Sequence, residues 1–233
     1  MQLITFSGPP SSGKTSVIMK TIESLIARGL KVGVVKFDCL FTDDDLQYEK
    51  LGIPVKKGLA GSLCPDHYFV SNIEDVTQWG IKKGLDLLIT ESAGLCNRCS
   101  PYIQEIKAIC VIDNLSGINT PKKVGPMLKS SDIVVITKGD IVSQAEREVF
   151  AMKVQSVNHR ATILHVNGLN GQGAYELSTL ITTNNKEVTT LEGSKLRFSM
   201  PSALCSYCLG ETRIGKAHQL GNVRKIDLGD DDE

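Results

Sequence analysis

The chain has 233 residues, with 26 Lys or Arg residues against 26 Asp or Glu residues, so its formal net charge is zero. This balance excludes the strongly basic composition that is typical of nucleic-acid-binding proteins. The sequence has no run of about 18 apolar residues and no signal-peptide pattern, so we expect a soluble, cytoplasmic protein without a membrane-spanning segment. The length suits one domain and an extension.

The cysteines indicate metal or thiolate chemistry. Seven are present, and four of them form two Cys-x-x-Cys pairs, Cys96 with Cys99 and Cys205 with Cys208. In a reducing compartment this pattern argues against a disulfide framework. Metal binding or thiolate chemistry is the expected use of both pairs.

The first motif is Gly-Pro-Pro-Ser-Ser-Gly-Lys-Thr at residues 8–15, directly after an apolar run at residues 3–6 that predicts a strand. Such a loop directs backbone N–H groups at phosphate oxygens at the start of a helix. An ordinary glycine-rich turn is the alternative, but the helical pattern of residues 14–27 favours a phosphate loop. Lys14 is expected to contact the β- and γ-phosphates, and Thr15 to bind magnesium. The expected nucleotide contacts are Gly8, Ser11, Ser12, Gly13, Lys14, Thr15 and Ser16.

Residues 31–37 predict a second, buried strand, which Asp38 follows. Ligands bind at the carboxyl edge of α/β sheets, so Asp38 is a candidate to orient magnesium or its water. The alternative is a common turn residue. The three acids at residues 43–45 predict the start of a short helix, and we interpret them as solvated rather than as a metal site.

Residues 54–70 are predicted to be rich in loops and contain Cys64 and His67. Thiolate and imidazole groups suit zinc or nickel. Two ligands do not complete a site, and a buried cysteine beside a histidine in a turn is the alternative. A helix is predicted for residues 74–83.

The third strand, predicted for residues 85–90, runs into Glu91, and Gly94 follows shortly after. An acid here can reach magnesium or the attacking water, and a glycine allows the backbone to approach a γ-phosphate. Cys96 and Cys99 follow at once, so a pair of thiols lies on the segment that would respond to the γ-phosphate. Two incidental cysteines or a redox pair are the alternatives, although no thioredoxin-like context surrounds them.

Two further strands are predicted for residues 108–113 and 132–137, and the second ends in Thr137-Lys138-Gly139-Asp140. A carboxylate can accept hydrogen bonds from N1–H and the 2-amino group of guanine, and the aliphatic part of Lys138 can cover the base. After a helix at residues 143–157 and a strand at residues 161–166, a glycine-rich loop is suited to back a purine. Its candidate contacts are Asn167 and Gly168.

From about residue 184 the pattern becomes polar and loses its periodicity. We predict a main domain at residues 1–184 and an extension at residues 185–233 that carries Cys205 and Cys208. An extension this short cannot bury a core of its own. It is expected to dock on the main domain or to be held by a metal.

The order of these motifs resembles the HypB/UreG/CobW-type GTPases, the metallocentre-assembly branch of the SIMIBI class. The resemblance rests on residues 8–15, 34–38, 91–94, 137–140 and 167–173. It implies a mostly parallel sheet flanked by helices, magnesium-dependent GTP hydrolysis, a nucleotide-dependent homodimer and delivery of a metal to a client metalloenzyme or its maturation partner. Two departures are Thr137, where the family usually has Asn, and an inserted Asp between Cys64-Pro65 and His67.

We therefore predict an α/β phosphate-loop GTPase with a short cysteine-containing extension. Lys14, Asp38 and Glu91 are the residues expected to carry hydrolysis. The nucleotide state is expected to control a soft metal at Cys96 and Cys99. Zn²⁺, Ni²⁺ and an iron–sulfur cluster remain open, as does whether the two cysteine pairs join within one chain or across a dimer.

Three other functions are weighed against this one. The main alternative is a nucleotide-dependent iron–sulfur protein that transfers electrons or activates a partner. The others are a metal-binding regulator that does not hydrolyse nucleotide and a small-molecule kinase, which the guanine motif disfavours.

Overall fold

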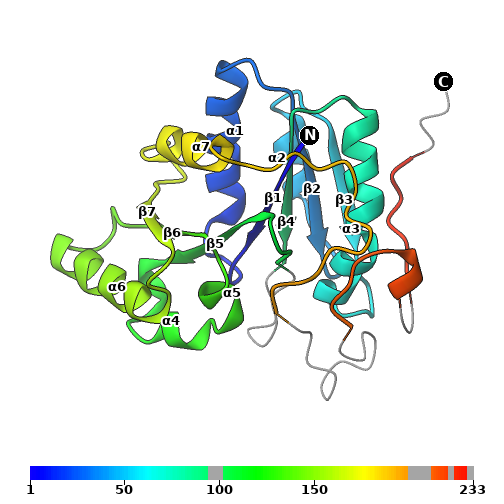
Figure 1. Ribbon diagram of the computed structural model, residues 1–233. Coiled ribbons are helices and arrows are strands. Elements are labelled where there is room, and N and C mark those ends of the chain that lie inside the picture. Colours follow the sequence, from blue (N-terminus) through cyan, green and yellow to red (C-terminus); the bar gives the residue numbers. More distant parts are fainter. Residues whose placement is uncertain (94–101, 199–210, 220–222, 230–233) are drawn as a thin grey trace.

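The computed structural model describes residues 1–93, 102–198, 211–219 and 223–229, and within these residues seven strands form one parallel sheet (Figure 1). The strand order is β3-β2-β4-β1-β5-β6-β7. This confirms the predicted α/β class. The strands are β1 (Gln2–Ser7), β2 (Val32–Asp38), β3 (Val55–Leu59), β4 (Leu87–Ser92), β5 (Lys107–Asp113), β6 (Ile133–Thr137) and β7 (Thr162–His165).

Helices cover both faces of the sheet, so its central strands are apolar on both sides. One face carries α1 (Lys14–Ala27), α2 (Asp44–Glu49) and α7 (Ala174–Thr182). The other carries α3 (Pro65–Lys82), α4 (Thr120–Lys123), α5 (Pro126–Lys129) and α6 (Gln144–Val157). Two 3₁₀ turns, η1 (Asn114–Ser116) and η2 (Lys216–His218), complete the described elements.

The local sequence explains where the long helices begin and end. In α1 the buried side chains recur at helical spacing, and the helix ends before Gly29, which has a φ of +82°. The helix α6 begins after Ser143, whose hydroxyl accepts a hydrogen bond from the Glu146 N–H while the Glu146 carboxylate accepts one from the Ser143 N–H. This is a capping box.

The prediction of a loop-rich region at residues 54–70 is wrong. The edge strand β3 occupies part of it, and α3 already begins at Pro65 rather than near residue 74. The strand escaped the pattern because Lys56 and Lys57 interrupt its apolar residues, as is common at the edge of a sheet. The first turn of α3 is polar and begins with a proline at a position where helices tolerate it.

Described residues of the extension pack against the main domain, which is one of the two arrangements expected for a segment this short. Arg197 anchors it, because its guanidinium contacts both carboxylate oxygens of Asp132 at 2.7 and 2.8 Å and the carbonyl of Ile103 at 3.0 Å. The extension residues that share one hydrophobic cluster with β2, β4 and α3 are Val188, Leu191, Leu196, Ile214 and Ile226.

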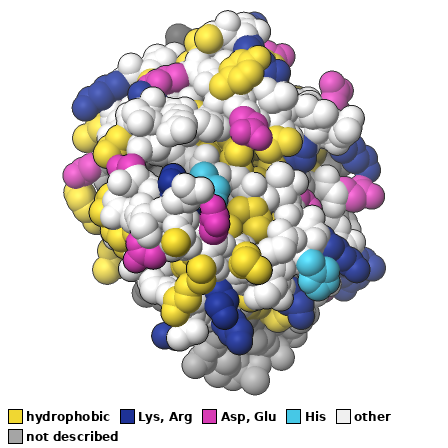
Figure 2. Space-filling model, turned by 90° about the vertical axis from the view of Figure 1, so that its left-hand side faces the viewer, with side chains coloured by type: hydrophobic (Ala, Val, Ile, Leu, Met, Phe, Trp, Pro, Cys, Tyr) yellow, Lys and Arg dark blue, Asp and Glu magenta, His cyan; other side chains and the backbone are white. Residues whose placement is uncertain are grey.

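The surface on the side of α6 and β7 carries acidic, basic and hydrophobic side chains interspersed with one another (Figure 2). Among the described residues, no helix combines the length and the apolar character that crossing a membrane requires.

Candidate nucleotide site

The phosphate loop lies between β1 and α1, and two of its glycines are required by its geometry. Gly8 has a φ of +152°, and a Cβ on it would lie 2.1 Å from the carbonyl oxygen of Val111 in β5. Gly13 has a φ of +87° and precedes α1. The ammonium of Lys14 donates to the carbonyls of Gly8 and Pro9 at 3.0 Å each, so it lies over the loop.

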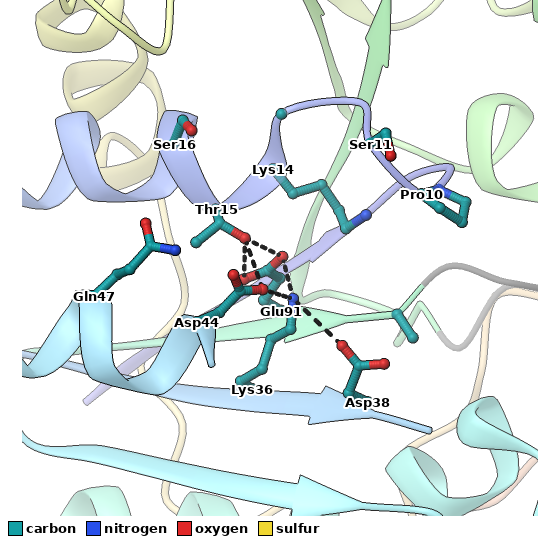
Figure 3. A pocket seen from close by; sticks show the side chains of 12 residues that line it. Pro10, Ser11, Lys14, Thr15, Ser16, Lys36, Asp38, Asp44, Gln47 and Glu91 are labelled. Atoms are coloured by element: carbon teal, nitrogen blue, oxygen red, sulfur yellow. Dashed lines mark hydrogen bonds and ion pairs between the residues drawn. The ribbon is translucent and has the colours of Figure 1, made fainter. Parts of the chain in front are cut away.

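A cavity of about 380 Å³ opens beside this loop at the carboxyl ends of β2 and β4 (Figure 3). It brings together the predicted hydrolytic residues Lys14, Asp38 and Glu91 with Thr15. The side chains and backbone that line it are those of Pro10, Ser11, Gly13, Lys14, Thr15, Ser16, Lys36, Asp38, Asp44, Gln47, Glu91 and Ala93.

Three oxygen-bearing side chains meet in this cavity. The Thr15 Oγ1 atom lies 3.0 Å from Oε1 of Glu91 and 3.1 Å from Oδ2 of Asp44. Neighbouring ligands of an octahedral magnesium ion are about 2.9 Å apart, because each bond is about 2.05 Å long. Hard oxygen ligands at this spacing fit Mg²⁺, and Thr15, Asp44 and Glu91 are the residues that would hold it.

Residues 43–45 do begin a helix as predicted, but the interpretation of these acids as solvated is wrong for two of the three. The carboxylate of Asp44 faces the cavity, and Asp45 is buried and pairs with Lys57 at 2.6 Å. Asp43 does precede α2, although its side chain makes no capping hydrogen bond. The reason is tertiary: Tyr48 is buried in the core, and this turns the start of α2 toward the phosphate loop.

Lys36, to which the sequence analysis assigned no role in the site, bridges the acids. Its side chain is only 4% exposed, and its ammonium lies 2.7 Å from Glu91 Oε1, 2.7 Å from Asp44 Oδ2 and 3.8 Å from Asp38 Oδ2. Burial lowers the pKa of Lys36, but attraction to Glu91 and hydrogen bonds with Asp44 and Glu91 outweigh it and raise the pKa overall. A lysine within a strand predicted to be buried is a usable signal, because a buried charge requires partners.

Two neighbouring side chains share this charged environment. Burial lowers the pKa of Lys14. Burial opposes ionisation of Asp44, but the hydrogen bonds from Lys36 and Thr15 and the charge of Lys36 together outweigh it and hold the pKa of Asp44 below the usual value.

Tyr48 is a second residue that sequence reasoning missed. It is fully buried, and its hydroxyl donates to Oε2 of Glu91 at 2.7 Å. Burial, together with the charge of Glu91, raises its pKa well above the ordinary value, so the hydroxyl stays a donor. Glu91 is thereby held from two sides, by Tyr48 and by Lys36.

The structure is compatible with both interpretations of Asp38, as a residue that orients magnesium or its water and as a turn residue. It lines the cavity, and its Oδ2 atom faces Lys36 at 3.8 Å. Its Oδ1 atom also accepts a hydrogen bond from the N–H of Cys39 at 2.8 Å, as turn aspartates do.

A second cavity of about 200 Å³ lies on the other side of the phosphate loop, where a base would be expected. The loops after β6 and β7 form it, so both predicted base-binding segments meet here. Its lining residues are Gly13, Ser16, Thr137, Lys138, Asp140, Ile141, Asn167, Gly168 and Leu169.

The predicted base-binding segment after β6 is hydrogen-bonded directly to the phosphate loop. The Thr137 hydroxyl donates to the Ser12 carbonyl at 2.6 Å, and the Lys138 ammonium donates to the Ser11 carbonyl at 2.7 Å. Asn167 shapes its own loop, because its Oδ1 atom accepts from the N–H of Leu169 at 2.8 Å. Thr137 therefore has a structural partner where the family usually has Asn.

The candidate soft-metal residues are placed only in part. Cys64 precedes α3, and His67 lies in its first turn, almost fully buried and 3.4 Å from the Ser71 hydroxyl. In the described ranges no group of three or more Cys, His, Asp or Glu side chains is placed to hold a metal ion. The candidates Gly94, Cys96, Cys99, Cys205 and Cys208 lie outside the described residues.

Fold and site together define a phosphate-loop nucleotide-binding protein with a magnesium-type oxygen set. A family model for the CobW/HypB/UreG nucleotide-binding domain matches residues 2–165. The chain belongs to this family, which confirms the resemblance deduced from the motifs.

Individual relatives agree with this membership. The chain is 51% identical over 227 residues to the uncharacterized protein MJ0120 of Methanocaldococcus jannaschii, covering 97% of each chain. It is 32% identical over 193 residues to urease accessory protein UreG 2 of Methylorubrum populi, covering 76% of this chain and 89% of that protein. The crystal structure of HypB from Helicobacter pylori in complex with nickel has a similar fold, with a TM-score of 0.62 at 19% identity over 78% of this chain and 85% of that one.

Proposed function

We propose that this protein is a magnesium-dependent GTPase that assists delivery of a metal ion or metallocofactor to a client enzyme. The observation that carries the proposal is the meeting of Thr15, Asp44 and Glu91 beside the phosphate loop. A hydroxyl and carboxylates in this position suit the metal of a magnesium nucleotide. Magnesium, when bound, would neutralise charge on the β- and γ-phosphates.

The chain's own residues would supply positioning and charge, which are what phosphoryl transfer requires. Lys14 lies over the loop and would neutralise phosphate oxygens. The Tyr48 hydroxyl holds Glu91 in one orientation, so Glu91 would meet the metal or the attacking water without rearrangement of its own rotamer. Asp38, at the edge of the cavity, is the candidate to orient a metal-bound water.

Guanine is the base that we propose. Asp140 lines the second cavity, where its carboxylate would accept hydrogen bonds from N1–H and the 2-amino group. Leu169 and the aliphatic part of Lys138 would cover the two faces of the base.

Metal delivery is supported by the family and by the cysteines. One relative is named a urease accessory protein, and a structural neighbour was solved with nickel. We propose Cys96 and Cys99 as the metal-binding pair that responds to the nucleotide, with Cys205 and Cys208 as further ligands. Cys64 and His67 are the weaker candidates.

The described residues beside the two cysteine-bearing segments lie next to each other. The Arg197 N–H donates to the Tyr102 carbonyl at 2.7 Å, and the Leu196 N–H donates to the Thr212 carbonyl at 2.7 Å. Cys99 is three residues before Tyr102, and Cys208 is four residues before Thr212. The segments that carry the two Cys-x-x-Cys pairs therefore join the described structure at neighbouring residues. This supports a four-thiolate site within one chain over separate sites.

Elemental analysis of anaerobically purified protein tests the metal. Zinc or nickel at one ion per chain supports delivery of a single ion, whereas a brown protein absorbing near about 400 nm would favour the iron–sulfur alternative. Cys99→Ser and Cys208→Ser should each abolish binding if the four thiols share one site. Loss with only one of the two variants would indicate separate sites.

Separate experiments test the coupling between nucleotide state and metal affinity and the hydrolysis of GTP. Metal affinity should differ between the protein with GDP and the protein with a non-hydrolysable GTP analogue, and equal affinities contradict the coupling. The same two nucleotide states should differ in the fraction of homodimer measured by light scattering. Absence of GTP hydrolysis by the metal-loaded wild type would contradict the GTPase assignment.

A further inference from the structure

Lys36 contacts the same oxygen atoms that fit a magnesium ion. Its ammonium lies 2.7 Å from Oε1 of Glu91 and 2.7 Å from Oδ2 of Asp44. These two atoms are also the ones that lie 3.0 and 3.1 Å from the Thr15 hydroxyl (Figure 3). A monovalent cation built into β2 therefore occupies the region between the carboxylates where a divalent ion would be coordinated.

The balance of charges around the cavity makes the contact between Lys36 and the carboxylates important for binding of divalent ions. Lys14 and Lys36 face three carboxylates, those of Asp38, Asp44 and Glu91. Without Lys36, the acids would face a single ammonium and would attract divalent ions even without a nucleotide. An ammonium and a divalent ion repel each other when both contact the same two oxygens.

The Lys36 ammonium could also reach a second partner, an oxygen of a bound phosphate. The four-carbon stem of lysine is flexible, and its ammonium is a compact donor of three hydrogen bonds, which suits a phosphate oxygen as well as a carboxylate. Lys36 already lines the cavity beside the phosphate loop. A bound triphosphate would add negative charge on the side of the cavity opposite Glu91 and Asp44.

We propose that Lys36 determines when this site accepts a divalent cation: its ammonium competes with free ions for Glu91 and Asp44 and moves to the terminal phosphate when Mg²⁺ arrives with a triphosphate. This inference rests on the proposed GTP function. It makes the site a poor binder of free metal ions, which matters in a protein that handles a metal of another kind elsewhere in the chain.

Binding of Mn²⁺, followed by electron paramagnetic resonance on the full chain stripped of nucleotide, tests the competition. Lys36→Met should bind Mn²⁺ at least about tenfold more tightly than the wild type, because the carboxylates lose their competing cation. Lys20→Gln, which removes a partly exposed lysine paired with Glu23 outside the cavity, should stay close to the wild type. Unchanged or weaker Mn²⁺ binding by folded Lys36→Met overturns the proposal.

A second measurement on Lys36→Met is nucleotide preference, which should fall whereas Mn²⁺ affinity rises. The preference for a non-hydrolysable GTP analogue over GDP should fall about tenfold in Lys36→Met, because one phosphate contact is lost. A merely structural role would weaken Mn²⁺ and analogue binding together, and an unchanged preference for the analogue overturns the phosphate contact. A wild type that binds no GTP contradicts the proposed function, while the Mn²⁺ measurement still decides the role of Lys36.

If Lys36→Met does not fold, the wild type still provides a test. Lysine labelled with ¹³C at Cε gives one signal for each lysine, and Lys36→Arg identifies that of Lys36. This signal should stay in place when Mg²⁺ is added alone at low millimolar concentration and should shift with Mg²⁺ and the analogue together. A signal that stays in place in both cases overturns the displacement.

Discussion

The two ends of the candidate nucleotide site are built in different ways. The phosphate end consists of charged side chains that the sheet buries, since the side chain of Lys36 is 4% and that of Glu91 1% exposed. The base end consists of the loops after β6 and β7, where Asp140 is exposed and Leu169 is 82% exposed. Buried charges must be paired in advance, whereas exposed loop residues need no partner before the ligand arrives.

This difference predicts which residues of the site can be substituted without loss of stability. At the phosphate end each charged group holds another, so a single substitution affects stability, metal affinity and chemistry together. At the base end a substitution of an exposed residue such as Asp140 or Leu169 is expected to alter recognition alone. Four variants test this contrast.

Lys14→Ala should have the largest effect, because it removes the ammonium that would stabilise charge on the phosphates. We expect GTP hydrolysis to fall about 100- to 1,000-fold, as for other charge-stabilising donors. Steady-state phosphate release measures it. Lys20→Gln, at a partly exposed position of the same helix, should retain wild-type turnover; a similar loss there would contradict a specific role for Lys14.

Asp140→Asn should change base preference about 100-fold in favour of xanthosine triphosphate over GTP, because an amide can donate to the 2-oxo group where the carboxylate could only accept. Competition binding of the two nucleotides measures the change. The melting temperature should stay within about 2 °C, because the residue is exposed. Unchanged GTP affinity would remove the assignment of this loop to guanine.

Tyr48→Phe tests the buried network at the phosphate end. Loss of the 2.7 Å hydrogen bond to Glu91 should lower the free energy of unfolding by about 1–3 kcal/mol, the usual range for a bond to a charged group. Urea unfolding followed by circular dichroism measures it. Tyr175→Phe is the matched control, since Tyr175 is 69% exposed and should show no change. Equal stabilities for both variants would mean that Glu91 needs no support from Tyr48.

Leu169→Ala should have the smallest effect. The side chain lines the base cavity but is largely exposed, so its loss should weaken GTP binding only about three- to fivefold without altering stability. Titration calorimetry measures the affinity. A loss as large as that from Asp140→Asn would show that the base end depends on apolar cover more than on hydrogen bonds.

Most of the sheet could be predicted because its central strands are continuous apolar runs. The edge strand β3 could not, since Lys56 and Lys57 lie within it and it pairs with one neighbouring strand, β2. The apolar contacts of the extension could not be predicted either, because Val188, Leu191 and Leu196 are scattered through a polar segment. They form a hydrophobic cluster only once they pack against α3 and β4. A domain boundary after residue 184 stays a prediction.

The sequence by itself determined the phosphate loop, the family and the candidate base loop, because each is a contiguous motif whose geometry depends on neighbouring backbone. Only the tertiary structure brought together the group of side chains that would hold magnesium and the lysine between them. Thr15 and Glu91 are 76 residues apart, and Lys36 and Asp44 come from two further elements. Which charges meet is a property of strand order and helix orientation, and no local pattern records it. Lys36 was therefore one more residue of an apolar strand until the fold placed it between two carboxylates.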